Sequence, residues 1–352
     1  MDDQRRAFLE ELLETPSPSG HETEGQRVWL EYVEDVADET RTDAYGNAVA
    51  TYDGGEGPHV VVSGHADEIG YAVADVTEEG FVRIIPIGGT DPVVSRGTQI
   101  HVHTAEGTVN GVIGQTAIHL RDEGDEGQEI RAQHVDVGAA DGEEARELVE
   151  IGDPATPASG VHDLAGTRLA ARGLDNRVGT WIAAETLRRA RERDVDARIS
   201  AVSTVQEELG LKGAEMVGFS LDPDAAIAVD VTHASDNPGF PEDWANDVSL
   251  GEGPVVARGT ANHPTLVRAV REAAAATDVA VQLQATGRRT GTDADAFYTQ
   301  RGGIPTLNVG IPNRYMHTPA EVVDTADLEA AAEVLAATLD READRESFGV
   351  RL

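Results

Sequence analysis

A histidine followed two residues later by a carboxylate stands at the end of a short apolar run. Residues 59–62 read His-Val-Val-Val, a β-branched run that predicts a buried strand delivering His65 and Asp67 to its exposed end. The imidazole of His65 can bind a divalent cation, and Asp67 can hold the ring or the metal's surroundings in place. A single His-X-Asp pair is more often a surface turn or a satisfied polar pair. It indicates a metal site only if further ligands join it.

Three further predicted strands each end in a loop with metal-ligating side chains: Glu207 and Glu208 after 198–205, Asp230 after 225–229, and His317 beyond 305–309. Two adjacent carboxylates at the end of a buried strand need a cation beside them, because like charges held close at low dielectric are costly. Open α/β sheets bind ligands at the carboxyl ends of their strands. The four strand ends therefore predict one shared site.

A further carboxylate, Asp175, lies where residues 173–179 introduce a strong helix, whose inward side is expected to carry Val178, Trp181, Ile182 and Leu187. Asp175 is well placed as the N-cap of this helix, and capping is its simplest role. Added to the strand ends, it would complete the nitrogen and oxygen ligands for two metal ions.

Alternating helices and strands surround these residues on both sides of a segment with a different pattern. Apolar residues recur at helical spacing in some stretches and form short strand-like runs in others. We expect helices at 4–14, 22–36, 263–277, 293–300 and 325–339, and strands at 40–43, 47–52 and 281–285.

Between about residues 71 and 162 the chain carries short strand-like segments separated by glycines at steps of about ten residues. That spacing suits a small β barrel or sandwich. His101 and His103 share one face of a predicted strand there. No carboxylate lies nearby in a comparable setting, so a partly buried or interface pair is favoured over a metal site.

The charge of the chain is unusual. Its 352 residues include 64 acids and 28 bases, for a formal net charge of −36, and Lys212 is the only lysine. The acids are spread over the whole chain, so an acidic tail does not explain them. Salt near 1 M shortens the Debye length to about 3 Å and removes most of the self-repulsion. A salt-loaded cytoplasm is the simplest explanation and is favoured over an ordinary acidic mesophile protein. We do not expect a nucleic acid as a direct partner, because a polyanion would be repelled.

The composition also limits the ligands and the location. No cysteine is present, so a metal must be held by His, Asp and Glu. No window approaches 18 consecutive apolar residues, and the N-terminus begins with acids where a secretory signal would carry bases. We expect a cytoplasmic protein without a membrane span.

In their order along the chain, these motifs resemble those of the TET-type dinuclear metallo-aminopeptidases, the glutamyl-aminopeptidase-like family often labelled endoglucanases. The matching landmarks span nearly the full length: residues 18–22, 65–70, 174–177, 206–208, 229–230, 291–294 and 314–321. The resemblance implies a three-layer αβα zinc-peptidase catalytic domain made of residues 1–70 and 164–352. It also implies that residues 71–163 form an inserted, PDZ-like β-barrel domain that mediates dimerisation.

The resemblance also implies a role for each site residue. One metal would be held by His65 and Asp230, the second by Glu208 and His317, and Asp175 would bridge them. Two cations about 3.5–4 Å apart lower the pKa of a shared water and polarise the scissile carbonyl. Glu207 would be the general base and would pass the water's proton to the leaving amine. Asp67 would orient and polarise His65.

The implied activity is removal of N-terminal residues from short peptides with two Zn²⁺ or Co²⁺ ions. Family members assemble as tetrahedral dodecamers that admit only peptides, so self-association through the inserted domain is expected, although a dimer fits this sequence as well. Asp293 either lies near the substrate pocket or caps its own helix.

Three alternatives share part of the pattern. A di-zinc carboxypeptidase or deacylase of the same clan would use the same ligands, but those relatives usually carry their extra domain after the Glu-Glu motif, not before it. A glycosidase would need two carboxylates flanking a sugar and an aromatic platform, and only 4% of the residues are aromatic. A non-catalytic metal-binding assembly protein is the alternative from a different class.

Overall fold

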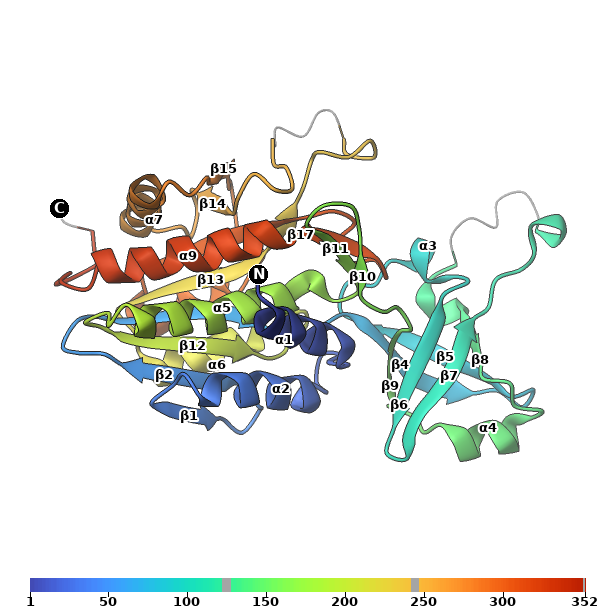
Figure 1. The fold of residues 1–352 in the computed structure, drawn as a ribbon. Helices are drawn as coiled ribbons and strands as arrows, with labels where there is room; N and C mark the ends of the chain where they lie inside the picture. Colours follow the sequence, from blue (N-terminus) through green and yellow to red (C-terminus); the bar gives the residue numbers. More distant parts are fainter. Residues whose placement is uncertain (122–127, 242–246, 351) are drawn as a thin grey trace.

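The computed structural model describes residues 1–121, 128–241, 247–350 and 352, and it has a larger and a smaller lobe (Figure 1). The larger lobe is built on an eight-stranded sheet in the order β1-β2-β12-β3-β13-β16-β14-β15. Its strands are β1 (Glu39–Thr42), β2 (Ala48–Asp53), β3 (His59–His65), β12 (Arg198–Thr204), β13 (Ala225–His233), β14 (Val255–Arg258), β15 (Gln282–Ala285) and β16 (Thr306–Asn313).

The central strands of this sheet run parallel to one another. β12 pairs with β3, β3 with β13, and β13 with β16, all in parallel register. The strands that flank this group, β2 and β14, pair with it antiparallel. The carboxyl ends of β12, β3, β13 and β16 therefore open at the same edge of the sheet, which is where ligands bind in α/β folds.

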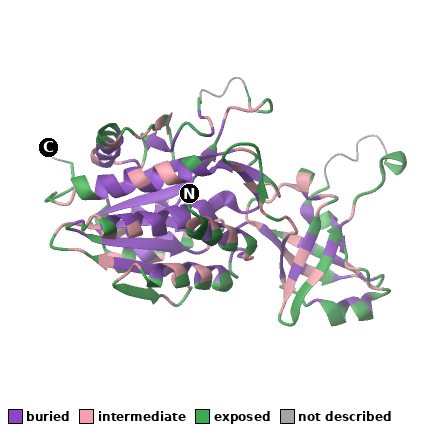
Figure 2. Cartoon of the chain, viewed as in Figure 1, coloured by how far each residue is buried: buried purple, intermediate pink, exposed green. Residues whose placement is uncertain are grey.

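Helices cover both faces of the sheet, because the buried residues of each strand alternate between two cores. Val60 and Val62 of β3 pack into one core and Val61 into the other. The first core is shared with α1 (Asp3–Glu14), α2 (Thr23–Glu34), α5 (Leu174–Glu192), α7 (Pro264–Thr277) and α9 (Thr325–Arg341), and the second with α6 (Lys212–Leu221) and α8 (Ala294–Phe297). Figure 2 shows the central strands and α5 buried along almost their whole length.

The first and last helices, α1 and α9, each begin at a capping aspartate. Asp2 accepts a hydrogen bond from the backbone N–H of Arg5 at the start of α1, and Asp324 accepts one from Ala326 at the start of α9. The predictions of helices at 4–14 and 325–339 are confirmed by α1 and α9. Within the described ranges, no helix is long and apolar enough to cross a lipid bilayer.

The smaller lobe is a closed barrel in the order β4-β5-β8-β7-β6-β9. Its core is separate and includes Ile84, Ile100, Val102 and Val135. The strands are β4 (Gly70–Val76), β5 (Phe81–Ile87), β6 (Gln99–Thr104), β7 (Gly107–Ile113), β8 (His134–Asp136) and β9 (Pro154–Pro157), accompanied by α3 (Pro92–Ser95), η1 (Ile118–Leu120), η2 (Ile130–Ala132) and α4 (Gly142–Leu148). The predicted barrel is confirmed; β8 and β9 were not predicted, because three or four residues are too few to show a periodic pattern.

The paired histidines of the barrel are partly buried, as expected. Nε2 of His103 lies 2.8 Å from the hydroxyl of Thr156, and burial lowers the pKa of His103 to about 4. Among the described residues, neither His101 nor His103 belongs to a cluster that could hold a metal ion.

A three-stranded sheet of β10 (His162–Asp163), β11 (Arg168–Ala171) and β17 (Glu321–Asp324) fixes two segments that reach the site. In its antiparallel register Ala171 pairs with Glu321. The loop that follows β11 carries Asp175, and the loop that precedes β17 carries His317, so this pairing brings the two loops together. A single 3-10 turn, η3 (Gln300–Gly302), lies between α8 and β16.

Candidate metal centre

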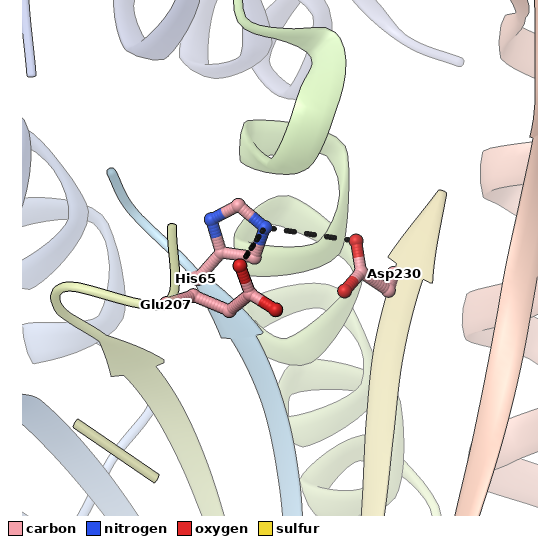
Figure 3. Close-up of side chains that lie close together, drawn as sticks. All are labelled: His65, Glu207 and Asp230. Carbon is pink, nitrogen blue, oxygen red and sulfur yellow. Dashed lines mark ion pairs between the residues drawn. The ribbon is translucent and has the colours of Figure 1, made fainter. Parts of the chain in front are cut away.

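His65 lies at the centre of the predicted ligands, at the carboxyl edge of the parallel strands. It is the last residue of β3, and its side chain is 2% exposed. Its Nε2 lies 3.6 Å from Oδ1 of Asp230 and 3.9 Å from Oε2 of Glu207. Figure 3 shows the two carboxylates approaching the ring from the neighbouring strands on either side. The parallel pairing of β12, β3 and β13 therefore brings these three residues together at one edge of the sheet.

The sequence suggested that Asp230 lies just beyond the end of its strand, but the structure places it within the strand. β13 continues through Asp230 to His233, because its backbone stays paired with β16 up to the pair His233↔Asn313. The apolar run ends at Val229, but the pairing does not. Asp230 thus projects from a rigid strand rather than from a loop.

Asp175 connects the two histidines. Its Oδ1 lies 3.2 Å from Nε2 of His65, and its Oδ2 lies 3.3 Å from Nε2 of His317. The same nitrogen of His317 lies 3.4 Å from Oε1 of Glu208. One carboxylate therefore faces both imidazoles, each through a different oxygen. The bridging role that the resemblance implied for Asp175 stays a prediction.

The prediction that Asp175 caps its helix is wrong. Asp175 and Asn176 have non-helical backbone angles, and Asn176 takes the capping role, because its Oδ1 accepts a hydrogen bond from the N–H of Gly179 at 3.0 Å. The regular helix starts after Asp175. The Asp175 side chain is consequently free of the backbone and turns toward the histidines.

Asp67 holds the turn that carries the two adjacent glutamates. Its carboxylate accepts hydrogen bonds from the backbone N–H groups of Glu207, at 3.0 Å, and Glu208, at 3.1 Å, and from the hydroxyl of Ser19 at 2.7 Å. The backbone carbonyl of Asp67 lies 3.1 Å from Nδ1 of His65, closer than its Oδ1 at 3.4 Å. Asp67 therefore orients the ring mainly through its backbone, and its side chain positions the Glu207–Glu208 turn.

Glu321 does the same for the opposite side of the site, and sequence reasoning assigned it no role. Its carboxylate is 2% exposed and accepts hydrogen bonds from the backbone N–H groups of Asp175, at 2.8 Å, and His317, at 3.1 Å. A third bond, at 3.3 Å, comes from the side-chain amide of Asn313. The sequence signal was available, since Glu321 closes the same motif as His317, but the backbone partners of a carboxylate cannot be deduced from the motif.

A buried ion cluster supports the loop that leads to Asp175. Glu68 accepts hydrogen bonds from the guanidinium groups of Arg172 and Arg177, at 2.5 Å each, and from the backbone N–H of Ser17 at 3.0 Å. Despite the opposing effect of burial, the two arginines lower the pKa of Glu68 to about 2. This cluster ties the segment before α2 to the segment that carries Asp175.

The buried carboxylates of the centre outnumber its histidines, and the pKa values of both kinds of group are shifted. Burial raises the pKa of Glu207 to about 10, with a further contribution from Asp230, although the neighbouring His65 opposes the rise. Burial likewise raises the pKa of Asp230 to about 6. Hydrogen bonds to Asp175 and Glu208 raise the pKa of His317 to about 11. Buried carboxylates with raised pKa values are stabilised by a nearby cation.

Asp293 does not cap its helix through its side chain. Its Oδ2 accepts a hydrogen bond from the hydroxyl of Thr204 at 2.6 Å, and its Oδ1 is buried without a hydrogen-bond partner among the described residues. Burial raises the pKa of Asp293 to about 7. Thr290 and Thr292, just before Asp293, line a hollow of about 320 Å³ that opens onto His65.

Two hollows meet at the centre. The first lies above the strand ends and includes His233 and Met316, and the second lies toward the barrel and includes Tyr71, Val94 and Pro319. Both are lined by the same three residues of the centre, namely Asp175, Glu208 and His317. A ligand that occupied both hollows would cross the candidate metal site.

The donor set fits divalent cations. The ligand atoms of two triplets, His65 with Glu207 and Asp230, and His65 with Asp175 and Glu208, each lie within 4.8 Å of one another. Imidazole nitrogens and carboxylate oxygens without thiolates are suitable ligands for zinc and similar metals. A cation among them would favour the charged forms of Glu207 and Asp230, whose pKa values are raised mainly by burial. The structure thus contains a candidate metal site built from acidic residues and histidine.

Comparison with known proteins identifies the family of the chain. The chain is 36% identical over 339 residues to a lysyl aminopeptidase of Pyrococcus furiosus, covering 95% of this chain and 96% of the relative. Its fold matches that of a TET aminopeptidase from a marine sediment thaumarchaeon, with a TM-score of 0.90, 29% identity and 97% of both chains covered. It also matches the TET1 peptidase of Pyrococcus horikoshii, with a TM-score of 0.84, 30% identity, and 95% of this chain and 98% of that chain covered.

The TET1 peptidase is described as able to assemble into a tetrahedron or a large octahedral shell. The family model of the M42 glutamyl aminopeptidases matches residues 46–334, which include every predicted site residue. The chain belongs to the M42 glutamyl aminopeptidase family and is a peptide-bond hydrolase of the TET aminopeptidase type.

Proposed function

We propose that the protein is a metal-dependent aminopeptidase that removes N-terminal residues from short peptides. Two divalent ions, Zn²⁺ or Co²⁺, would be held by His65 with Asp230 and by His317 with Glu208, and Asp175 would bridge them. The observation that carries this proposal is the position of Asp175, whose two oxygens lie 3.2 and 3.3 Å from the two imidazoles. A carboxylate between two histidines is suited to bridge two metal ions.

The chemistry divides between the ions and the side chains. Bound divalent cations would act as Lewis acids on the scissile carbonyl and lower the pKa of water. Glu207 is the general base: it takes a proton from the attacking water and returns it to the leaving amine. Its Oε2 lies 3.9 Å from Nε2 of His65, farther than the carboxylate oxygens of Asp175 and Asp230.

Asp67 is proposed as the positioning residue for this step. It binds the backbone N–H groups of both Glu207 and Glu208. The base and the neighbouring ligand therefore keep a fixed separation while the proton moves. Preorganisation of this kind lowers the barrier because the catalytic group needs no rearrangement.

The proposal extends to assembly and environment. Residues 71–163 would form an inserted, PDZ-like domain through which copies of the chain dimerise, and the dimers would assemble into a dodecamer. Residues 1–70 and 164–352 would form a three-layer αβα catalytic domain. The assembly of the Pyrococcus horikoshii relative supports this proposal. The net charge of −36 supports a salt-rich cytoplasm as its location.

The experiment is hydrolysis of a panel of amino-acid p-nitroanilides in about 3 M salt, where charge repulsion is screened. Chelator, metal add-back and an N-blocked peptide accompany the panel. We expect unblocked substrates to be cut, blocked ones spared, and chelation to be reversed by zinc or cobalt. Cleavage of only blocked or acylated substrates would indicate a deacylase or carboxypeptidase of the same clan. Metal uptake without any turnover would indicate a binding protein.

A further inference from the structure

A loop of the barrel lies against one side of the candidate metal centre. It consists of Gly88, Gly89 and Thr90, which follow β5 directly. The carbonyl oxygen of Gly89 lies 3.3 Å from Nδ1 of His317, across a separation of 228 residues in sequence. Since a carbonyl can only accept a hydrogen bond, the proton of the neutral imidazole is favoured on Nδ1. Nε2 is then left free to face Asp175 and Glu208.

The loop approaches the site too closely for a side chain. A methyl group at Gly89 would stand 2.9 Å from Nδ1 of His317. A methyl group at Gly88 would stand 2.7 Å from Cγ2 of Ile69 and 3.2 Å from Cβ of Glu208, and Gly88 has a φ of +67°. A side chain at Gly89 would therefore meet the predicted ligand His317, and a side chain at Gly88 would meet Ile69 and the predicted ligand Glu208.

Thr90 anchors this loop to the root of the barrel. Its hydroxyl lies 2.9 Å from the carbonyl oxygen of Gly70 and 3.2 Å from that of Ile87, so it can donate to either. Gly70 begins β4 and follows the His65 motif by only a few residues. The position of the Gly89 carbonyl is therefore tied to the segment that carries His65 and Asp67.

Among the described residues of the barrel, none gives the other histidine such support. Nδ1 of His65 lies 3.1 Å from the carbonyl oxygen of Asp67, which belongs to its own segment. Of the ring-orienting carbonyls, only that of His317 comes from the smaller lobe. The barrel thus contacts one half of the site and leaves the other to the sheet.

We infer that the Gly88–Gly89–Thr90 loop is a positioning element for His317, so that one of the two metal sites is completed by the barrel. The inference rests on the proposed function, since it assumes that His317 and Glu208 bind a metal ion. A carbonyl that accepts from a ligating imidazole fixes its ring orientation and increases its basicity, and loss of such a partner typically costs about 10–100-fold in metal affinity.

The test is a zinc titration of the chelator-stripped protein, followed by competition with a chromophoric chelator and repeated with Co²⁺ for its absorption spectrum. The wild type is expected to bind two ions. Gly89→Ala is expected to weaken one binding step by about 10–100-fold, leave the other unchanged, and alter the spectrum of one cobalt ion. A change confined to one step separates positioning from a general loss of structure.

Two further variants keep the inference testable if Gly89→Ala does not fold. Thr90→Ala removes the anchoring hydroxyl and should weaken the same step to a smaller extent, whereas Thr90→Ser keeps the hydroxyl and should restore it. Gly160→Ala is the matched control, because a methyl group there would lie 4.0 Å from its nearest neighbour. It should bind metal like the wild type.

The outcomes distinguish this inference from the proposed function. If the wild type binds fewer than two ions, the proposed function is wrong. If the wild type binds two ions and the Gly89 and Thr90 variants bind both with unchanged affinity, the barrel has no role in positioning His317. An equal weakening of both steps would also overturn the inference.

Discussion

The two histidines of the candidate centre differ in how they are supported. His65 ends a central strand, its side chain is 2% exposed, and its Nδ1 faces a carbonyl of its own segment. His317 lies in a loop, its side chain is 35% exposed, and its Nδ1 faces a carbonyl of the other lobe. One half of the site is thus built within the sheet, and the other is assembled from segments distant in the chain.

This difference indicates in which half a substitution should weaken metal binding more. The His65 half is fixed by strand pairing and should keep its geometry as long as the sheet is folded. The His317 half depends on two separate contacts. Glu321 accepts from the backbone of His317, and the carbonyl of Gly89 in the barrel loop faces its ring. We expect it to bind its metal ion more weakly and to be more sensitive to substitution.

The largest effect is expected on kcat, and it should distinguish the adjacent residues Glu207 and Glu208, which belong to different halves. Glu207→Gln should reduce kcat by about 10²–10⁴-fold, because it removes the proton acceptor, and should leave metal content near that of the wild type. Glu208→Gln should instead reduce metal content, because Glu208 faces His317. Both variants are checked by turnover and by metal analysis of the purified protein. Substantial turnover in Glu207→Gln would contradict its assignment as the base.

Glu68→Gln should affect both halves equally, because the ion cluster supports the loop of the shared carboxylate Asp175. Removing one partner of a buried ion pair leaves Arg172 and Arg177 uncompensated, which typically costs about 3–5 kcal/mol in the free energy of unfolding. Chemical denaturation at neutral pH measures this change. The exposed pair of Arg27 and Glu24 offers the control, and Glu24→Gln should change stability by less than about 1 kcal/mol.

The same cluster predicts a pH dependence. The pKa of Glu68 is lowered from 4.5 to about 2 in the folded protein, so its stabilising contribution is fully present above pH 4.5. It is lost as the pH falls from 4.5 toward 2, because over this interval the unfolded state binds a proton on Glu68 that the folded state does not. The stability difference between the wild type and Glu68→Gln should narrow over this interval. A difference that stays constant from pH 5 to pH 2 would rule out Glu68 as its source.

A smaller effect should distinguish the two carboxylates that hold backbone N–H groups. Asp67→Asn and Glu321→Gln each place an amide NH₂ where a carboxylate oxygen accepted from the backbone, and each should weaken metal binding by about 10–100-fold. Asp67→Asn should also lower kcat, since Asp67 positions Glu207. Glu321→Gln should leave kcat less affected and should weaken the step assigned to His317 most, because Glu321 holds the backbone of both His317 and the shared residue Asp175. Metal titration and steady-state kinetics compare the two, and identical profiles would mean that the halves are not independent.

Much of the site could be predicted from the sequence, because the residues that meet there follow parallel strands. His65, Glu207 and Asp230 converge as the strand ends indicated, and the barrel lies between the first motif and the second. Periodicity and motif order contain this information, since parallel strands end at one edge of a sheet.

The remaining features depend on contacts that no local pattern encodes. The cap at Asn176 replaced the expected cap at Asp175, because both residue types cap helices and only the contacts of Asp175 with the histidines distinguish them. The length of β13 depends on pairing with β16, and the contact between Gly89 and His317 depends on how the two lobes are packed. A glycine pair after a strand is ordinarily predicted as a turn.

Anomalous diffraction from crystals soaked in zinc, with data collected on both sides of the zinc absorption edge, tests the central claim most directly. We predict two peaks, one beside His65 and Asp230 and the other beside His317 and Glu208, with Asp175 between them. In crystals of Gly89→Ala, the second peak should lose occupancy while the first remains. A single peak, or peaks away from these residues, would contradict the account of a two-metal centre shared between the sheet and the barrel.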